Sequence, residues 1–419
     1  MKRLSLILLF VSGCDALSDL SQLGDSGQRC VDLNAEIAAC FGQDYGPLVC
    51  DGISDADLGN IEAALDGGAC DLLRQAAAID GDVRASYCRV LGDGCIDAVN
   101  PSPDFAPTRY PIVLVNGIDV SPGFRYSQRI QDVMHEVGGH EVYLAIDTPF
   151  ETPQRRAVVL WERVQEVLEE SGAEKVNLVC HSLGGLDCRY LVSPGGLHWD
   201  VDASHEDIVR TVASITMIST AHRGTPAADA ALGYLPDADR TEAIDALATF
   251  FGAAFTGEAL EEDAHLRESI ASLSSSATAA FNAEIVDAPG IYYQSFAGFS
   301  RPFGTPDEDY DARLYAACST EEGPLIWNWN GKHDYMALPL VPSFSIVGEA
   351  DREDAEGTEP NDGLCPVASA HWGRFRGCIA ADHMEQLGQY DLPDVNVRTG
   401  FDIAWFYANV AEDLAGMGL

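Results

Sequence analysis

Short apolar runs alternate with longer amphipathic segments over the middle of the chain. The apolar runs are rich in Val, Ile and Leu and predict buried strands at residues 111–115, 141–146, 176–179 and 212–218. The segments between them repeat apolar residues at helical spacing and predict helices at residues 129–137, 153–171 and 186–191. Strands that alternate with helices predict an α/β fold with a mostly parallel sheet, which binds ligands at the carboxyl ends of its strands.

The third predicted strand leads directly into Ser182, which has Cys180 two residues before it and Gly184 two residues after it. This spacing is typical of a nucleophile elbow, a tight turn from strand to helix that exposes a serine hydroxyl. Cys180 stands where glycine is usual, and a small apolar thiol fits there. A purely structural turn is the alternative, but the position between an apolar strand and a helical segment favours catalysis. We expect Cys180 and Cys188 to be buried thiols.

A serine nucleophile needs a base and an acid. In α/β-hydrolases the chain order is Ser, then Asp or Glu, then His, which leaves His371 and His383 as the best of ten histidines. Asp362 lies in an Asn-Asp-Gly turn beyond an apolar run at 344–347, a loop position suited to an acid at a strand end. His371 is so close to Asp362 in sequence that it fits the same local structure, so we expect His383 to be the base. Two other histidines are expected to be polar packing residues, His181 and His222.

The first residues predict an export signal. Lys2 and Arg3 precede a short apolar run at 4–11, and Val-Ser-Gly-Cys at 11–14 resembles the lipobox of bacterial lipoproteins. The run is too short to span a bilayer, which needs roughly 20 residues. We expect a signal peptide at 1–13 and lipidation of Cys14, which would anchor the mature chain outside the cytoplasm to a bacterial membrane or cell surface. An ordinary signal peptide cut nearby, or an incidental cysteine, is the alternative.

Half of the cysteines crowd into one N-terminal segment, at Cys30, Cys40, Cys50, Cys70, Cys88 and Cys95. An even set outside the cytoplasm predicts three disulfides, whose connectivity the sequence leaves open. A zinc site is the alternative, although paired C-x-x-C motifs are missing. We therefore expect a disulfide-stapled helical module at 14–100, a proline-containing linker at 101–109 and a catalytic domain at 110–419. Later in the chain, one more bridge and one leftover thiol are expected among Cys318, Cys365 and Cys378.

The composition narrows the classes of partner. The chain has 419 residues, 47% of them hydrophobic, and a net charge of -41. Such a negative surface repels nucleic acid and anionic membranes, which excludes both as expected partners apart from the lipid anchor. The charge is explained either by adaptation to a salty medium or by solubility alone. Beyond the signal sequence, the chain holds no run apolar enough for a transmembrane helix.

Six stretches, in the same order, resemble the bacterial true lipases of the Pseudomonas and Burkholderia type, over about residues 108–419. They are YPIVLVNGI, KVNLVCHSLGGLDCRYL, ISTAHRGTPAAD, YYQSFAG, NDGLCPVAS and DHMEQLGQ. The resemblance implies an α/β-hydrolase fold in which Ser182 is the nucleophile, Asp362 the acid and His383 the base. It also implies an oxyanion hole made by the backbone amides of Ile118 and Leu183. Asn116 replaces the usual His of this family, and the six-cysteine module has no counterpart in it.

The resemblance further implies a helical lid at about residues 237–282. Its apolar residues would cover an acyl-chain groove and dock on a lipid interface. Core packing is the alternative for such a stripe, and it would be preferred without the resemblance. The residues are Leu247, Phe250, Phe251, Ala254 and Phe255.

A structural calcium ion is also implied by the resemblance, whereas the chemistry itself needs no cofactor. Asp334 and Glu385 match the family's carboxylate positions, with Glu385 where Asp is usual, and Gln389 and Pro393 match the backbone carbonyls. Calcium takes 6–8 oxygen ligands in flexible geometry, which suits this set. Two more solvated acids in a very acidic chain are the alternative.

Together these features predict an extracytoplasmic lipase or esterase. It would hydrolyse carboxylic esters of long acyl chains, such as acylglycerols, at an interface and through an acyl-enzyme. An acyltransferase, a phospholipase or a polyester depolymerase would use the same fold. A catalytically inactive surface protein, whose disulfide module binds a partner, is the alternative from another class. The sequence leaves open whether folding needs a dedicated chaperone.

Overall fold

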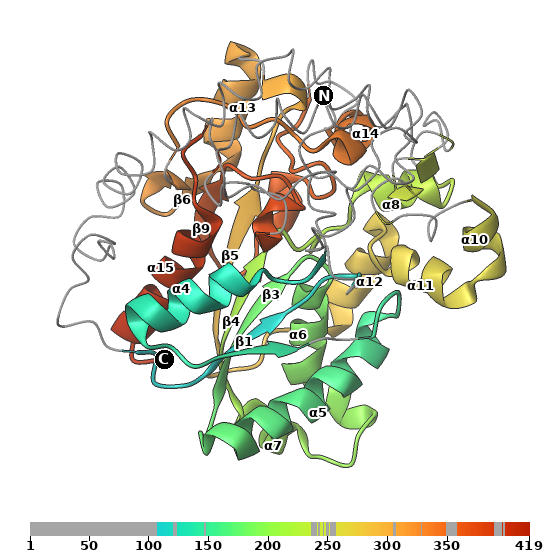
Figure 1. Ribbon diagram of the computed structural model, residues 1–419. Coiled ribbons are helices and arrows are strands. Elements are labelled where there is room, and N and C mark those ends of the chain that lie inside the picture. Colours follow the sequence, from blue (N-terminus) through green and yellow to red (C-terminus); the bar gives the residue numbers. More distant parts are fainter. Residues whose placement is uncertain are drawn as a thin grey trace, which may run out of the picture.

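The computed structural model describes most of the chain from residue 107 onward (Figure 1). The described residues are 107–119, 124–145, 148–235, 241, 244–245, 247–248, 251, 257–304, 307–327, 329–348, 358–388, 396 and 399–419. The predicted signal peptide, Cys14, the six-cysteine module and most of the linker therefore lie outside the described residues.

A seven-stranded sheet in the order β2-β1-β3-β4-β5-β9-β8 forms the centre of the molecule. All of its neighbouring strands pair in parallel. The strands are β1 (Ile112–Val115), β2 (Val142–Ala145), β3 (Val176–His181), β4 (Val212–Ile218), β5 (Tyr292–Gly298), β8 (Ile326–Trp327) and β9 (Arg374–Ile379). β6 (Ser319–Thr320) and β7 (Gly323–Pro324) pair in antiparallel fashion and form a second, two-stranded sheet.

Helices cover both faces of the sheet (Figure 1). Because side chains alternate along a strand, Ile112 and Leu114 of β1 pack with α4 (Gln128–Gly138) and α15 (Ile403–Gly416) on one face. The intervening β1 residues, Val113 and Val115, pack on the other face, whose helices are α5 (Pro153–Ser171), α6 (Gly184–Val192) and α7 (His205–Val209). The central strands are buried on both faces, which explains their continuous apolar sequence.

Local signals set the ends of the first helices. Ser127 caps α4 by accepting a hydrogen bond from the Ile130 amide, and Gly139 ends it in the left-handed region. Pro153 begins α5, and Gly172, at φ 69°, ends it.

The remaining helices and 3-10 turns lie in the segments that connect these elements. The helices are α8 (Pro226–Ala231), α10 (Gly257–Glu262), α11 (Ala264–Ser272), α12 (Ser275–Glu284), α13 (Glu308–Ala317) and α14 (Val341–Gly348). The 3-10 turns are η5 (Leu197–Trp199), η7 (Pro302–Gly304), η8 (Leu338–Leu340), η9 (Val367–Ala370) and η10 (Glu385–Leu387). Apolar residues of α8, α10 and α11 form one cluster with Ile118, Leu183 and Leu186, which follow β1 and β3.

The parallel sheet, its two helical layers and a serine on the turn after β3 make this an α/β-hydrolase fold, as the sequence predicted. The seven predicted strands and helices are all present, with ends shifted by a few residues at most. One expectation was wrong: the apolar run at 344–347 lies in α14 and does not end a strand. Among the described residues, no helix is both long and apolar enough to cross a membrane.

Candidate active site

Ser182 occupies a strained turn between β3 and α6. Its φ is 53°, a left-handed conformation that is uncommon for a residue with a side chain. The helix can start this close to the strand only because the next residues are small. A Cβ on Gly184 would meet the Asn116 carbonyl oxygen at 2.5 Å, and a Cβ on Gly185 would clash with the Thr220 side chain. These contacts give the elbow spacing a physical cause.

The two cysteines that flank the elbow form a disulfide, so the expectation of buried thiols was wrong. Cys180 lies near the end of β3 and Cys188 lies in α6, with their Cα atoms 6.9 Å apart. Because the elbow folds the helix back along the strand, residues eight apart in sequence come within bridging range. A second bridge joins Cys318 to Cys378, and Cys365 is a free buried thiol, which confirms the expected bridge and leftover.

The structure brings Ser182, His383 and Asp362 together from three separate segments. The Ser182 Oγ lies 2.8 Å from Nε2 of His383, and Nδ1 of His383 lies 2.8 Å from Oδ2 of Asp362. Asp362 is fully buried, and His383 is 5% exposed. This is the arrangement in which a carboxylate orients an imidazole so that it can accept a serine proton.

Asp362 is held by four donors. The backbone amides of Leu364 and Cys365 donate to Oδ1, whereas His383 and the Gln386 side chain donate to Oδ2. Burial raises the pKa of Asp362, but the positive charge that His383 can carry and these hydrogen bonds outweigh burial and lower the pKa below its usual value. The acid is therefore kept ionised.

Gln386 is a site residue that the sequence reasoning missed. Its Nε2 donates to Asp362 Oδ2 at 2.9 Å, and its Oε1 lies 3.1 Å from Nε2 of His181. The His181 ring in turn lies 4.6 Å from the His383 ring, centroid to centroid. Burial and the proximity of His383 lower the pKa of His181 to about 3, so His181 stays neutral. Gln386 thus connects Asp362 with His181, the residue before Ser182.

The other candidate histidines lie away from this group. His371 stacks on Phe375 at 3.6 Å between ring centroids, and burial lowers its pKa to about 4. His222 is buried beside Arg189 and Trp372, where burial, Arg189 and Arg223 lower its pKa well below the usual value. Both rings are therefore packed against other side chains, as expected for His222.

The loop after β1 lies against the elbow. Asn116 donates from Nδ2 to the Phe124 carbonyl at 2.8 Å, and its own carbonyl accepts from Arg156 at 2.9 Å. Arg156 also pairs with Asp187 of α6 at 2.7 Å, with both side chains fully buried. These contacts hold the loop that carries Gly117 and Ile118 at a fixed distance from Ser182. A Cβ on Gly117 would meet the Ser182 Cβ at 2.9 Å.

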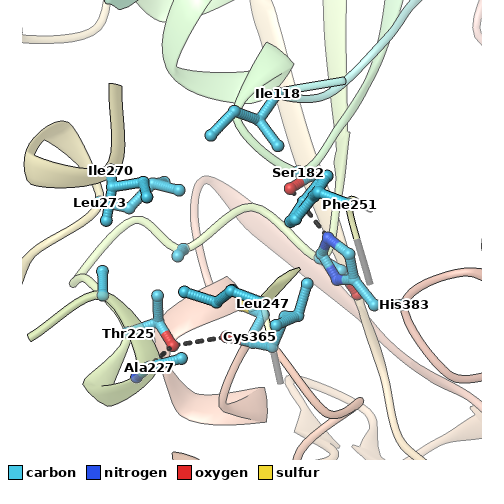
Figure 2. A pocket seen from close by; sticks show the side chains of 14 residues that line it. Ile118, Ser182, Thr225, Ala227, Leu247, Phe251, Ile270, Leu273, Cys365 and His383 are labelled. Carbon is cyan, nitrogen blue, oxygen red and sulfur yellow. Dashed lines mark hydrogen bonds between the residues drawn. The ribbon is translucent and has the colours of Figure 1, made fainter. Parts of the chain in front are cut away.

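A largely apolar pocket opens on Ser182 and His383 (Figure 2). Figure 2 shows Ile118, Ser182, Phe251 and His383 at one end of it and Ile270 and Leu273 at the other. Its walls are Ile118, Ser182, Ser219, Ala221, Thr225, Ala227, Ala228, Leu247, Phe251, Ile270, Leu273, Leu364, Cys365 and His383. Leu247 and Phe251 of the predicted lid thus line the same pocket as Ser182, whereas Phe250, Ala254 and Phe255 lie outside the described residues.

Three buried carboxylates next to His383 form a candidate metal site. One oxygen each from Asp334, Asp382 and Glu385 lies within 4.8 Å of the others, and all three residues are at most 1% exposed. Such a buried group of acids suits a hard cation with oxygen ligands. Two of the predicted ligands, Asp334 and Glu385, are brought together. Asp382 was missed, and Gln389 and Pro393 lie outside the described residues.

No family model matches the chain. The chain is 27% identical to a triacylglycerol lipase of Vibrio cholerae over 294 residues, which cover 68% of this chain and 81% of the relative. It is 36% identical to a triacylglycerol lipase of Burkholderia plantarii over 132 residues, 30% of this chain and 33% of the relative. Among solved structures, the lipase of Staphylococcus hyicus aligns with 75% of this chain and 98% of its own, at 18% identity and a TM-score of 0.45.

Proposed function

We propose that this chain, a lipase-like carboxylic ester hydrolase by its similarity to curated triacylglycerol lipases, cleaves long-chain acylglycerols outside the cytoplasm. The observation that carries the proposal is the hydrogen-bonded series Ser182, His383 and Asp362 at the end of an apolar pocket. The two described disulfides support an oxidising compartment. Anchoring through Cys14 would keep the enzyme at a membrane or cell surface.

In the proposed mechanism, the Ser182 Oγ attacks the ester carbonyl while His383 Nε2 takes its proton. The backbone amides of Ile118 and Leu183 stabilise the negative oxygen of the tetrahedral intermediate. His383 then gives the proton to the departing alcohol, which leaves an acyl-enzyme. Water, activated by the same nitrogen, releases the fatty acid and restores Ser182. Asp362 fixes the ring and stabilises the imidazolium throughout.

Calcium, when bound at Asp334, Asp382 and Glu385, would supply fixed positive charge that holds the His383 loop against the loop after β8. Its role in the proposal is structural, because the carboxylates lie beside the base and no step of the reaction uses them.

The proposal is tested with an emulsion of a long-chain triacylglycerol and release of fatty acid measured by pH-stat titration. We expect the purified protein to release fatty acid and Ser182→Ala to lower kcat on the order of a millionfold with an unchanged circular dichroism spectrum. Ser319→Ala, an exposed serine in β6, is the matched control and should keep the wild-type rate. A Ser182→Ala protein with a tenth of the wild-type rate would refute the assignment.

A further inference from the structure

The disulfide between Cys180 and Cys188 closes a covalent ring around Ser182. The ring also contains Leu183, whose backbone amide is one of the two donors of the proposed oxyanion hole. Both cysteines are fully buried. A change at this bridge would therefore act on the attacking oxygen and on one oxyanion donor together.

The first turn of α6, which follows Ser182, is weak by itself. Leu183 is its N-cap residue and has no side-chain group that accepts a hydrogen bond from the first amides, and the helix opens with Gly184 and Gly185. Glycine disfavours a helix because it loses more conformational freedom than other residues. Neither glycine can become a better helix former, since an added Cβ would clash with the Asn116 carbonyl oxygen or with the Thr220 side chain. Another contact must hold this turn beside the strand.

The disulfide supplies that contact. Cys180 is fixed in the middle of the sheet, because it pairs with Val115 of β1 on one side and with Met217 of β4 on the other. Cys188 is the fifth residue of α6, about one turn beyond its first glycine. The bond between the two cysteines thus ties the first turn of the helix to a fixed point of the central strand.

The residue at position 180 makes the bond more important than it would be elsewhere. Glycine is usual two residues before the serine of an elbow, where strand and helix lie close together. A cysteine adds a side chain at this place, and its sulfur can approach the helix closely only while it is bonded to Cys188, because unbonded atoms must stay further apart. An unbonded thiol at position 180 would therefore fit the elbow less well than either the disulfide or a glycine.

We propose that the Cys180–Cys188 disulfide is a positioning element of the reaction, which fixes the Ser182 Oγ and the Leu183 amide relative to each other. This inference rests on the proposed ester hydrolysis. Neither cysteine is among the described residues that line the pocket at Ser182, so binding of the ester does not depend on the bridge. The rate does, because a displacement of about 1 Å in a reacting group can lower it about a hundredfold. The chain without this bridge folds but hydrolyses slowly, and it reaches its full rate only where its cysteines are oxidised.

The test compares kcat and KM for 4-nitrophenyl butyrate in wild type and three variants with unchanged circular dichroism spectra. Cys188→Ala leaves an unbonded thiol at position 180, and we expect kcat to fall at least about tenfold with little change in KM. The double variant Cys180→Gly and Cys188→Ala restores the usual elbow residue and should recover most of the wild-type kcat. Recovery excludes a packing defect at position 188, which both variants share.

Removal of the other described disulfide is the matched control for stability. In the chain-entropy model a disulfide stabilises more when it closes a longer loop, and Cys318 and Cys378 are 60 residues apart whereas Cys180 and Cys188 are 8 apart. The double variant Cys318→Ala and Cys378→Ala should therefore lower Tm at least as much as Cys188→Ala does. Its kcat, measured below its Tm, should stay at the wild-type value.

A refolding experiment on wild type decides the case in which Cys188→Ala does not fold. Reduced, unfolded protein is refolded with glutathione disulfide, which oxidises two protein thiols to a disulfide and is itself reduced to two glutathione thiols. Aliquots are assayed at once, while parallel aliquots are alkylated and their disulfides mapped by mass spectrometry. Ester hydrolysis should return together with the Cys180–Cys188 bridge.

Each other outcome overturns the proposal or the function beneath it. Activity that returns before this bridge forms, or Cys188→Ala with the wild-type kcat, overturns the positioning role. So does a glycine double variant as slow as Cys188→Ala, or a loss of kcat that follows Tm in the control as well. Wild-type protein that cleaves no ester refutes the proposed function instead.

Discussion

Single residues around Asp362 decide how well the proposed base is oriented. Gln386 fits its place because β5 ends in Gly298, where any Cβ would fall against the Gln386 amide. The amide donates to Asp362 and contacts His181, so it fixes the position of the Asp362 carboxylate. We regard Gln386 as a positioning residue that acts on the reaction through Asp362.

Replacing Gln386 should change the pH profile as well as the rate. In Gln386→Leu, Asp362 loses one of two donors on Oδ2, and a hydrogen bond to a charged group contributes about 1.5–3 kcal/mol, so we expect kcat to fall about tenfold with little change in KM. In Gln386→Glu, a second carboxylate would stabilise the imidazolium, and the acid limb of the kcat/KM profile should move to higher pH. Both are measured with a soluble 4-nitrophenyl ester.

Gln128→Leu, which changes an exposed glutamine of α4, serves as the control. A merely structural role for Gln386 would lower rates at all pH values and leave the limb in place in both variants, which would contradict this account.

The sequence predicted some residues of this site and missed others. Ser182, Asp362 and His383, which the structure brings together, were predicted because the elbow spacing and the chain order of α/β-hydrolases are strong local signals. Gln386 carries no such signal: its role arises only where the end of β3 and the segment that follows β9 meet the segment that precedes η9. Asp382 was likewise overlooked beside His383, although it completes the carboxylate group.

Among the elements, strands and helices followed the apolar pattern closely, whereas one of the two described disulfides was not predicted. Cys180 and Cys188 were expected to be thiols because the elbow spacing alone does not show how closely α6 approaches β3. The disulfide adds a covalent link across the strained turn at Ser182. Arg156 adds a buried ion pair between α5 and α6 and holds the loop after β1.

The carboxylate site joins two elements and gives a prediction at this scale. Asp334 follows β8, whereas Asp382 and Glu385 flank the base, so a cation there should bind the folded state alone and raise the melting temperature as its concentration rises. Calcium added back to EDTA-treated protein should raise Tm by several degrees at about 100 times Kd, where binding adds about 2.7 kcal/mol. Asp334→Asn should lose the shift, measured by differential scanning fluorimetry.

Asp309→Asn, an exposed acid at the start of α13, controls for general charge removal and should keep the calcium response. Magnesium at matched ionic strength controls for screening. If calcium shifts neither protein, or magnesium does as much, the site does not bind calcium.

At the scale of the whole molecule, buried neutral histidines make stability depend on pH. Burial lowers the pKa of His140 and of His371 to about 4, whereas the unfolded chain protonates histidine near 6.5. Between these pH values the unfolded state binds more protons, so the free energy of unfolding should fall as the pH drops from about 6.5 to about 4. Urea unfolding at a series of pH values measures this slope.

His371→Phe separates this effect from that of the acidic surface, whose protonation changes with pH in both proteins. Phenylalanine can keep the stack on Phe375 but cannot titrate. The free energy of unfolding of the variant should therefore fall by ~1 kcal/mol less than that of wild type between these pH values, after allowance for the partial exposure of His371. Parallel slopes for the two proteins would show that His371 is not protonated on unfolding.

Activation of Ser182 by His383 is tested most directly by labelling with a fluorophosphonate, which reacts with a serine hydroxyl only where a base activates it. Mass spectrometry of the digested protein should locate one adduct per chain on Ser182. The adduct should be absent in Ser182→Ala, slowed more than a hundredfold in His383→Ala and formed at the wild-type rate in His371→Phe. A folded wild-type protein that stays unlabelled, or that is labelled on another serine, would contradict the account.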